Sequence, residues 1–302
     1  MSVALNAAAD SLYVNDYYSN CVRAVNITSA AVSSFAGDIA WYGHVDGVGT
    51  VAMFSALIGS AFGADVGSAG TLYVTGDHYI RAVDVATRTT TTMAGSGSPL
   101  CTNGVGTFAQ FTSPAGIAYF SGNVYVGDNC GLIRAIDVST RAATTLVGGG
   151  SGDGVGTSAN PNRAESMTVS AAGVLYFTAS GQVRAVVIST RTLTTVAGAG
   201  DNNYANGVGT MASFNHPSGI GFDAALNALY VADSWNSRIR LIDIATRTVS
   251  DLVGSASTYL IDGRGSSATF YGLGGMDVDS MGNIYMADSY NTAIRVIARA
   301  GV

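Results

Sequence analysis

The chain has 302 residues with 39 glycines, only 4 prolines and 11% charged residues, a composition typical of many short strands joined by glycine turns. All 14 basic residues are arginine and the formal net charge is -6, which excludes a nucleic-acid binder that relies on clustered positive charge. No segment reaches the roughly 20 apolar residues of a transmembrane helix, and MSVALNAAAD lacks the pattern of a signal peptide. We therefore expect no nucleic-acid partner and no direct membrane insertion.

One phrase occurs six times: an aromatic-bearing strand, a short polar turn, then an apolar-Arg-apolar-apolar strand. In chain order the copies are SLYVNDYYSNCVRAVN, TLYVTGDHYIRAVD, NVYVGDNCGLIRAID, VLYFTASGQVRAVV, ALYVADSWNSRIRLID and NIYMADSYNTAIRVIA. Their arginines recur with a period of roughly 50 to 58 residues, which is the range of propeller blades. These arginines are Arg23, Arg81, Arg134, Arg184, Arg240 and Arg295.

A short strand precedes each phrase, and a Thr-rich strand ending in glycine follows it, as in TTTTMAG and LTTVAG. A glycine loop such as DGVGTVAMF or NGVGTMASF separates the units. Such four-stranded meanders must stack on their neighbours to bury both faces. The sequence therefore predicts a single all-β domain, a six-bladed β-propeller of four-stranded antiparallel blades. The blades are expected at approximately 1–53, 54–110, 111–160, 161–213, 214–269 and 270–302.

We name the strands of a blade A to D in chain order. The first A strand is predicted at 2–6 and the last C strand at 293–298, and no Thr-rich D strand follows it. The last blade is therefore predicted to lack its outer strand. Such an uncovered edge is a pairing site for another strand, either from a further domain or by self-assembly.

These phrases closely resemble the NHL-repeat family of β-propellers over nearly the whole chain. VADSWNSRIRLID and MADSYNTAIRVIA carry the resemblance most strongly, whereas blade 4 departs from it with Ala179 at the turn aspartate position. The resemblance implies the propeller fold. It implies no single function, because propellers host many unrelated activities.

A residue repeated in every blade is expected to be part of the scaffold. The C-strand arginines should fork onto carboxylate or carbonyl oxygens, with Asp46, Asp153 and Asp262 of the glycine loops as candidate partners. The turn aspartates should bond their own turn backbone; they are Asp16, Asp128, Asp233 and Asp288. A second set of arginines should be solvated at C-to-D hairpin tips, the alternative being an anion-binding ring. This set is Arg88, Arg141, Arg191 and Arg247.

Metal chemistry is the main enzymatic alternative, because the peptidyl-hydroxyglycine lyases resemble this propeller and hold zinc through histidines. The three histidines, His44, His78 and His216, occupy no equivalent positions, so we expect independent polar loop residues. Glu165 and Asp277 are candidate metal ligands at the central channel, for calcium or zinc. The alternative is that both are hydrated side chains in a wet pore.

The B-to-C turns carry the candidate binding residues, which are Tyr18, His78, Tyr79, Trp235 and Tyr290. Exposed, semi-rigid aromatic rings grouped on one face are typical of surfaces that bind glycans, peptides or proteins. The alternative is that these rings cover the grooves between blades.

Cys101 and Cys130 belong to the loop before blade 3 and to the B-to-C turn of that blade, so they are candidates for a disulfide, with Cys21 free. Asn26 begins the single glycosylation sequon, Asn26-Ile27-Thr28. These features favour an extracellular or cell-surface location.

No catalytic motif of the nucleophile-elbow or phosphate-loop type is present. We therefore expect a non-catalytic, extracellular binding propeller that recognises a protein or carbohydrate. One alternative is a metal-dependent lyase or hydrolase with its site at the central channel. Another is a structural or assembly module that pairs through the incomplete last blade.

Overall fold

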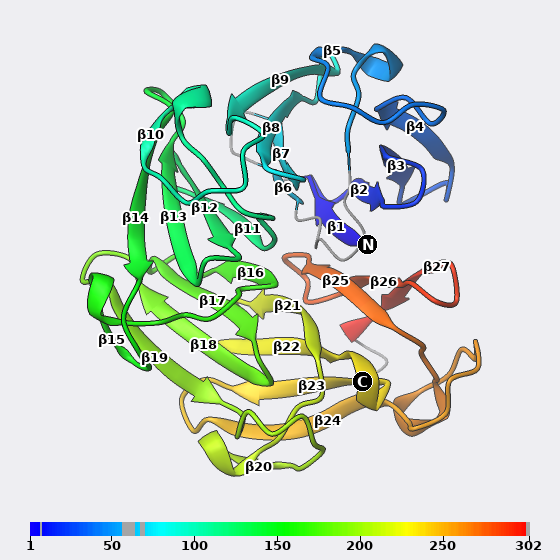
Figure 1. The fold of residues 1–302 in the computed structure, drawn as a ribbon. Coiled ribbons are helices and arrows are strands. Elements are labelled where there is room, and N and C mark those ends of the chain that lie inside the picture. The colour runs from blue at the N-terminus through cyan, green and yellow to red at the C-terminus, as the bar shows by residue number, and fades with distance from the viewer. Residues whose placement is uncertain (7, 56–63, 67–69, 300–302) are drawn as a thin grey trace. The chain divides into compact units, whose positions relative to one another are not determined.

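The computed structural model describes residues 1–6, 8–55, 64–66 and 70–299, which divide into two compact units. The N-terminal unit comprises residues 1–150 and 156–164, and the C-terminal unit comprises residues 151–155 and 165–302. Each unit contributes three antiparallel sheets (Figure 1). Whether the two units behave as the single predicted domain stays a prediction.

The N-terminal unit holds blades 1 to 3. Blade 1 consists of β1 (Ser2–Leu5), β2 (Ser11–Asp16), β3 (Cys21–Asn26) and β4 (Val32–Ala36). Blade 2 consists of β5 (Gly47–Val48), β6 (Ala64–Val66), β7 (Thr71–Gly76), β8 (Tyr79–Asp84) and β9 (Thr89–Ala94). Blade 3 consists of β10 (Gly104–Val105), β11 (Ile117–Phe120), β12 (Asn123–Asp128), β13 (Leu132–Asp137) and β14 (Ala142–Gly148).

The C-terminal unit holds blades 4 to 6. Blade 4 consists of β15 (Gly154–Val155), β16 (Ser166–Val169), β17 (Val174–Ala179), β18 (Gln182–Val187) and β19 (Thr192–Ala197). Blade 5 consists of β20 (Gly207–Val208), β21 (Pro217–Asp223), β22 (Ala228–Asp233), β23 (Arg238–Asp243) and β24 (Thr248–Gly254). Blade 6 consists of β25 (Leu273–Val278), β26 (Ile284–Asp288) and β27 (Ala293–Ile297).

The six sheets are the blades of an all-β, six-bladed propeller, which confirms the predicted fold class and the three-stranded last blade. No helix in the described part of the chain is long and apolar enough to cross a membrane.

Blades 2 to 5 have five strands rather than the predicted four, because part of each glycine loop is itself a strand. In the sequence DGVGT, the Gly-Val pair is extended and pairs antiparallel with the D strand of the following blade, as Gly47 and Val48 do with Thr90 and Thr89. The next glycine has a φ of +57° at Gly49 and starts the 3-10 turn η1 (Gly49–Val51), which leads the chain to the A strand. Each glycine loop therefore belongs to the sheet of the blade that follows it.

Neighbouring blades within a unit share their hydrophobic cores, as stacked repeats require. In the N-terminal unit, Phe35 and Phe54 pack with Leu72 and Val74 between blades 1 and 2. In the C-terminal unit, Tyr230 of β22 and Phe270 before β25 belong to the core between blades 5 and 6. The strands therefore bury residues on both faces, which explains the near-continuous burial of β22.

Candidate functional site

The C-strand arginines are scaffold residues, as predicted. In blade 2, Arg81 donates to Asp46 at 2.8 Å and to two carbonyl oxygens of the same loop at 3.0 Å. In blade 4, Arg184 donates to Asp153 at 2.6 Å. Both guanidinium groups are almost fully buried, so they are unavailable to a ligand.

Blades 3 and 5 supply the carboxylate from a different place. In blade 5, Arg240 donates to Asp233 of the B-to-C turn at 2.7 Å and to Asn206 of the glycine loop at 2.6 Å. Blade 3 has the same arrangement, with Arg134, Asp128 and Asn103. In blades 3 and 5, the turn position is aspartate and the glycine loop has an asparagine. In blades 2 and 4, the turn position is Gly76 or Ala179, and the glycine loop has an aspartate. Each buried arginine of blades 2 to 5 has one such acidic partner at these two positions.

The turn aspartates bond their own turn backbone as predicted, as Asp16 does with the Ser19 N–H at 3.3 Å, and they also bond other parts of the blade. Asp233 accepts hydrogen bonds from Asn236 in its turn at 2.9 Å, but also from the Asn215 backbone N–H at 2.7 Å and from Arg240. Asp288 similarly accepts from the Tyr271 N–H at 2.8 Å. These carboxylates tie the loop that enters a blade to the B-to-C turn.

The C-to-D arginines lie exposed in their turns, each with a positive φ between 55° and 59°, the left-handed region of backbone conformation that favours glycine. Arg88 also lies over the Phe35 ring at 5.6 Å. These positions fit solvated hairpin tips.

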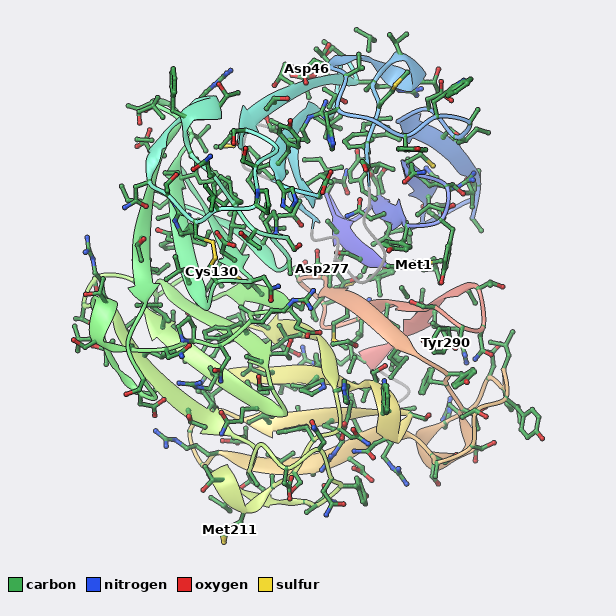
Figure 2. All side chains as sticks on the ribbon, in the orientation of Figure 1. Met1, Asp46, Cys130, Met211, Asp277 and Tyr290 are labelled. Carbon is green, nitrogen blue, oxygen red and sulfur yellow. A yellow bond between two sulfur atoms is a disulfide. The ribbon has the colours of Figure 1, made fainter. Side chains whose placement is uncertain are left out.

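Exposed aromatic rings of the C-terminal unit are held in pairs at the B-to-C turns. Trp235, in η5 (Ser234–Asn236), is 68% exposed and stacks on His216 with ring centroids 4.2 Å apart and an interplanar angle of 13°. Tyr290, labelled in Figure 2, is 64% exposed and lies 4.8 Å from the Tyr271 ring. Each ring is thus held by a neighbouring ring on one side, while much of its surface stays in solvent. These exposed rings are the candidate binding site.

Tyr204, in the loop that enters blade 5, has a structural role. The guanidinium groups of Arg238 and Arg240 lie over its ring at 4.5 and 4.9 Å, and its hydroxyl donates to Asp251 at 2.7 Å. That hydrogen bond is the main reason why the pKa of Tyr204 is raised.

The N-terminal unit presents Tyr18, which is 81% exposed and contacts the Tyr17 ring edge-on at 5.2 Å. Tyr79 is half-buried against His44, with ring centroids 4.3 Å apart. Tyr18 therefore offers a free ring, whereas Tyr79 is part of a packed cluster.

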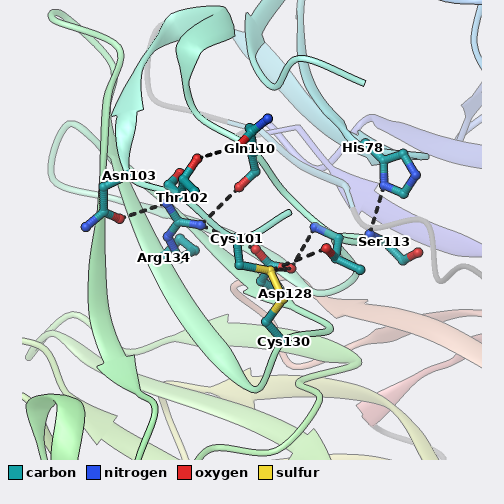
Figure 3. Close-up of a disulfide and its surroundings, with 10 residues drawn as sticks. His78, Cys101, Thr102, Asn103, Gln110, Ser113, Asp128, Cys130 and Arg134 are labelled. Atoms are coloured by element: carbon teal, nitrogen blue, oxygen red, sulfur yellow. Dashed lines mark hydrogen bonds and ion pairs between the residues drawn. A yellow bond between two sulfur atoms is a disulfide. The ribbon is translucent and has the colours of Figure 1, made fainter. Parts of the chain in front are cut away.

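His44 and His78 are not independent, contrary to expectation, because both contact Asp77. The distances are 3.0 Å from His44 Nε2 and 3.4 Å from His78 Nε2. His78 Nδ1 accepts a hydrogen bond from the Ser113 N–H at 3.2 Å (Figure 3). Burial lowers the pKa of His44, although the neighbouring Asp77 carboxylate acts in the opposite direction. This contact could not be predicted from the sequence, because His44 lies in a loop far along the chain from the B-to-C turn of blade 2.

The residues present do not fit a zinc site of three histidines. Within the described residues, only Cys101, Asp128 and Cys130 offer three histidine, cysteine or carboxylate ligand atoms within 4.8 Å of one another. The two sulfur atoms of this cluster are bonded to each other in a disulfide. Glu165 is exposed before β16, and Asp277 of β25 accepts a hydrogen bond from the Val278 N–H at 2.8 Å. Their role as metal ligands stays a prediction.

The disulfide joins Cys101 in the entry loop of blade 3 to Cys130 in its B-to-C turn, with Cα atoms 6.5 Å apart (Figure 3). It lies beside Asp128, which accepts from the Thr112 N–H of the same loop at 2.9 Å. Cys21 is a buried free thiol, and burial raises its pKa. Asn26 is exposed, and its side chain accepts a hydrogen bond from the Ser29 N–H at 2.8 Å.

Relatives in sequence share the repeat. The bovine NHL repeat-containing protein 2 is 35% identical over 94 residues, which are 30% of this chain and 13% of that protein. Protein SUPPRESSOR OF QUENCHING 1, chloroplastic, of Arabidopsis thaliana is 26% identical over 301 residues, which are 98% of this chain and 24% of that protein. The chain thus spans a small part of the length of both relatives.

Solved structures share the fold. An auxiliary nutrient binding protein from Bacteroides thetaiotaomicron has a TM-score of 0.71 at 15% identity, covering 98% of this chain and 68% of its own. A streptogramin B lyase has a TM-score of 0.56 at 11% identity, covering 98% and 82%. At these identities, binding proteins and lyases alike indicate only the fold.

The pattern of the SMP-30/Gluconolactonase/LRE-like region matches residues 68–302, which cover blades 3 to 6 and the described B, C and D strands of blade 2. With its six blades and repeated Arg-carboxylate scaffold, the chain belongs to the SMP-30/gluconolactonase/LRE-like family and is built from NHL-type repeats.

Proposed function

We propose that the chain is a non-catalytic binding propeller that recognises a protein or carbohydrate through exposed aromatic rings at its B-to-C turns. The observation that carries the proposal is the Trp235–His216 stack, in which an indole ring is ordered by one face while 68% of the residue stays exposed. A ring held in this way loses little conformational freedom when a ligand covers it. Flat aromatic surfaces of this kind suit sugar rings and apolar peptide side chains.

An extracellular or cell-surface location is part of the proposal. The Cys101–Cys130 disulfide and the exposed sequon at Asn26 support it, since disulfides persist in oxidising compartments. Mass spectrometry of the protein purified from its native source, with and without glycosidase, tests whether Asn26 carries a glycan.

The binding test starts from a glycan array and a protein-binding screen with the intact chain. For a ligand found there, Trp235→Ala is expected to weaken binding about tenfold, whereas Trp235→Phe, which keeps an aromatic ring, retains most of the affinity. Met211→Ala is the matched control, because Met211 is equally exposed on η4 (Gly209–Met211), outside the turns. Unchanged binding by both Trp235→Ala and Tyr290→Ala would reject the proposal.

The metal-dependent lyase or hydrolase is the competing hypothesis, and its candidate ligands are Glu165 and Asp277. Elemental analysis after dialysis against metal-free buffer tests it directly. One retained calcium or zinc per chain that Glu165→Gln or Asp277→Asn abolishes would favour that hypothesis over the binding propeller.

A further inference from the structure

A groove of about 440 Å³ lies between blade 2 and the C-to-D turn of blade 3, both in the N-terminal unit. Tyr73 of β7, Ala82 of β8 and Thr91 of β9 line one side of it. These three residues share one face of the sheet, because Ala82 is the register partner of both of the others. Val138 and Arg141 of blade 3 line the other side. Small-molecule sites have volumes of roughly 300–1,000 Å³, so the groove is large enough for a small ligand.

In the equivalent place between blades 1 and 2, an aromatic ring and an arginine pack together. Phe35 of β4 lies 4.8 Å from the Tyr13 ring, and the Arg88 guanidinium lies over Phe35 at 5.6 Å. One blade further on, Met93 stands in place of Phe35 and Arg141 in place of Arg88. Within the residues that the structure describes, the Arg141 guanidinium lies over no aromatic ring. The change from Phe to Met therefore leaves Arg141 without this partner.

Two further positions that are apolar in blade 4 are polar in blade 2. Thr71 pairs with Asp84 in the register of β7 and β8, as Val174 pairs with Val187 in β17 and β18. Val174 packs against the core between blades 4 and 5. Thr71 and Asp84 line the groove instead. Packing between blades does not account for this polar pair, because valine buries more apolar surface at the same positions.

Asp84 uses one carboxylate oxygen for its own turn. Oδ1 accepts hydrogen bonds from the Thr87 N–H at 2.7 Å and from the Thr87 hydroxyl at 2.9 Å. The hydrogen bond from the Thr87 backbone is the main reason why the pKa of Asp84 is lowered, so the carboxylate is ionised at neutral pH. Among the described residues, none donates a hydrogen bond to Oδ2 and none forms an ion pair with Asp84. This oxygen is available to a ligand.

Arg141 stands at the groove although its backbone conformation favours glycine. Its φ is +59° and its side chain is exposed. The backbone is fixed on both sides, because the Arg141 N–H donates to the Asp137 carbonyl at 2.8 Å and the Arg141 carbonyl accepts from the Gly106 N–H at 2.9 Å. In the described part of the chain, the guanidinium has no hydrogen-bond acceptor and no ion-pair partner. All five of its N–H donors are available to a ligand.

The groove is thus lined by a carboxylate and a guanidinium that do not pair with each other. Asp84 belongs to blade 2 and Arg141 to blade 3, so the two charges lie on opposite walls. Ala82, Val138 and the Thr91 side chain line the space with them. A ligand with a single charge would match one wall alone. A ligand with an ammonium group and a carboxylate matches both walls by charge-assisted hydrogen bonds.

We propose that this groove binds a small zwitterionic ligand with an apolar side chain, which is a free amino acid or a short peptide. Its ammonium group donates to Asp84 Oδ2, and its carboxylate accepts two N–H bonds from Arg141. Its apolar side chain covers Ala82 and Val138. This site is separate from the aromatic turns and does not depend on their role.

Three probes that differ in charge test the groove by isothermal titration calorimetry with the intact chain. L-leucine and the dipeptide alanyl-leucine carry both charges at different separations, whereas N-acetyl-leucine amide carries neither. We expect saturable 1:1 binding of leucine or of the dipeptide, and binding of the uncharged probe that is weaker by about tenfold or more. The tighter of the two charged probes distinguishes an amino acid from a peptide. No saturable binding of either, or equal binding of the uncharged probe, would overturn the proposal.

Two substitutions each remove one charge and keep the local backbone. Asp84→Asn retains an oxygen for Thr87, and Arg141→Asn introduces a residue type that tolerates a positive φ. Each is expected to weaken binding of the tighter charged probe about tenfold, the effect of losing one charge-assisted hydrogen bond. Unchanged affinity in both variants would show that the probe binds elsewhere and would reject the assignment.

Blade 5 offers matched controls, because Asp243 and Arg247 stand at the equivalent positions of its repeat. Asp243→Asn and Arg247→Asn make the same chemical changes and should leave the affinity unchanged. Weakening by these controls equal to that of the blade 2 and blade 3 variants would mean that the net charge, not the groove, decides binding. The double variant Thr71→Val/Asp84→Val gives blade 2 the residues of blade 4 and should abolish saturable binding, with circular dichroism confirming that it is folded. Retained binding by this folded variant would also reject the proposal.

Discussion

Buried arginines in this protein are each matched by a nearby aspartate, but the aspartate is not in a constant place. Arg184 uses Asp153 from a loop, and Arg240 uses Asp233 from a turn. Either position brings a carboxylate oxygen within 2.7 Å of the guanidinium. A buried arginine needs a carboxylate partner, but that partner can come from either position. This explains why the aspartates are distributed irregularly among the repeats.

Arg240→Met should be strongly destabilising, because it leaves the fully buried Asp233 carboxylate without its cation. Breaking such a pair costs about 3–5 kcal/mol. Urea unfolding followed by circular dichroism measures the loss. Arg247→Lys at an exposed hairpin tip is the control and should change stability by less than about 0.5 kcal/mol. Similar midpoints for the two variants would contradict the scaffold role.

Tyr230 should make stability depend on pH in the alkaline range. Burial, together with its hydrogen bond to Asp223 at 2.9 Å, raises the pKa of Tyr230 to about 12 from 10.0. A raised folded-state pKa gives stability that is complete below pH 10 and is lost as the pH rises towards 12. The expected contribution is about 2–3 kcal/mol.

Urea midpoints at several values between pH 9 and 12 test this expectation. Tyr230→Phe should show a smaller fall of the urea midpoint at alkaline pH than the unaltered chain, because it lacks this ionising group. Some fall should remain, because other buried tyrosines also ionise in this range. Parallel curves for the two proteins would show that Tyr230 ionises freely in the folded state.

At the scale of elements, the loops that enter blades are held to the B-to-C turns in several ways. Asp233 and Asp288 do this by hydrogen bonds, Trp235 by stacking on His216, and blade 3 by a covalent bond between Cys101 and Cys130. These contacts order the turns that carry the exposed rings, so the scaffold and the proposed binding surface are built from the same connections.

Reduction of the disulfide should destabilise the N-terminal unit. The bond closes a segment with a sequence separation of 29, for which the chain-entropy relation gives about 3–4 kcal/mol. Denaturant unfolding with and without reductant measures the difference. The double variant Cys101→Ala/Cys130→Ala should be insensitive to reductant, whereas Cys21→Ala, at the free thiol, should behave like the unaltered chain.

At the scale of the whole molecule, the blades are unequal within the described residues: blades 2 to 5 have five strands, blade 1 has four and blade 6 has three. In a repeat protein, stability is approximately a sum of the repeats and their interfaces. A blade with fewer strands has fewer hydrogen-bonded neighbours and should open more readily.

Native-state hydrogen exchange should therefore show a gradient within the C-terminal unit. Amides of β27 are expected to exchange at least tenfold faster than those of β18 and β23, which lie between two strands. Because all three are C strands of the same repeat, β18 and β23 are internal controls. Equal protection of the three strands would contradict the expected gradient, because it would show that the amides of β27 are as well covered as those of β18 and β23.

The repeat determined the fold at the level of sequence, because six copies of an apolar-Tyr-apolar strand, a short turn and an apolar-Arg-apolar strand specify the strands, turns and blade number through local propensity and periodicity. The sequence also predicted two sets of contacts from positions in the meander. These are the loop aspartates that pair with Arg81, Arg184 and Arg295, and the disulfide between Cys101 and Cys130. The fifth strands were missed because two residues, Gly47 and Val48, are too short to show a period.

Only the tertiary structure decided which side chains meet across loops. It brought His44 to Asp77, stacked His216 on Trp235 and left Asp262 exposed beside Arg295. Such contacts depend on how loops from different repeats fold over one another, and irregular loops have no periodicity from which this could be read. Repetition along the chain therefore specifies the scaffold, whereas the contacts of residues that do not follow the repeat are decided only by the tertiary structure.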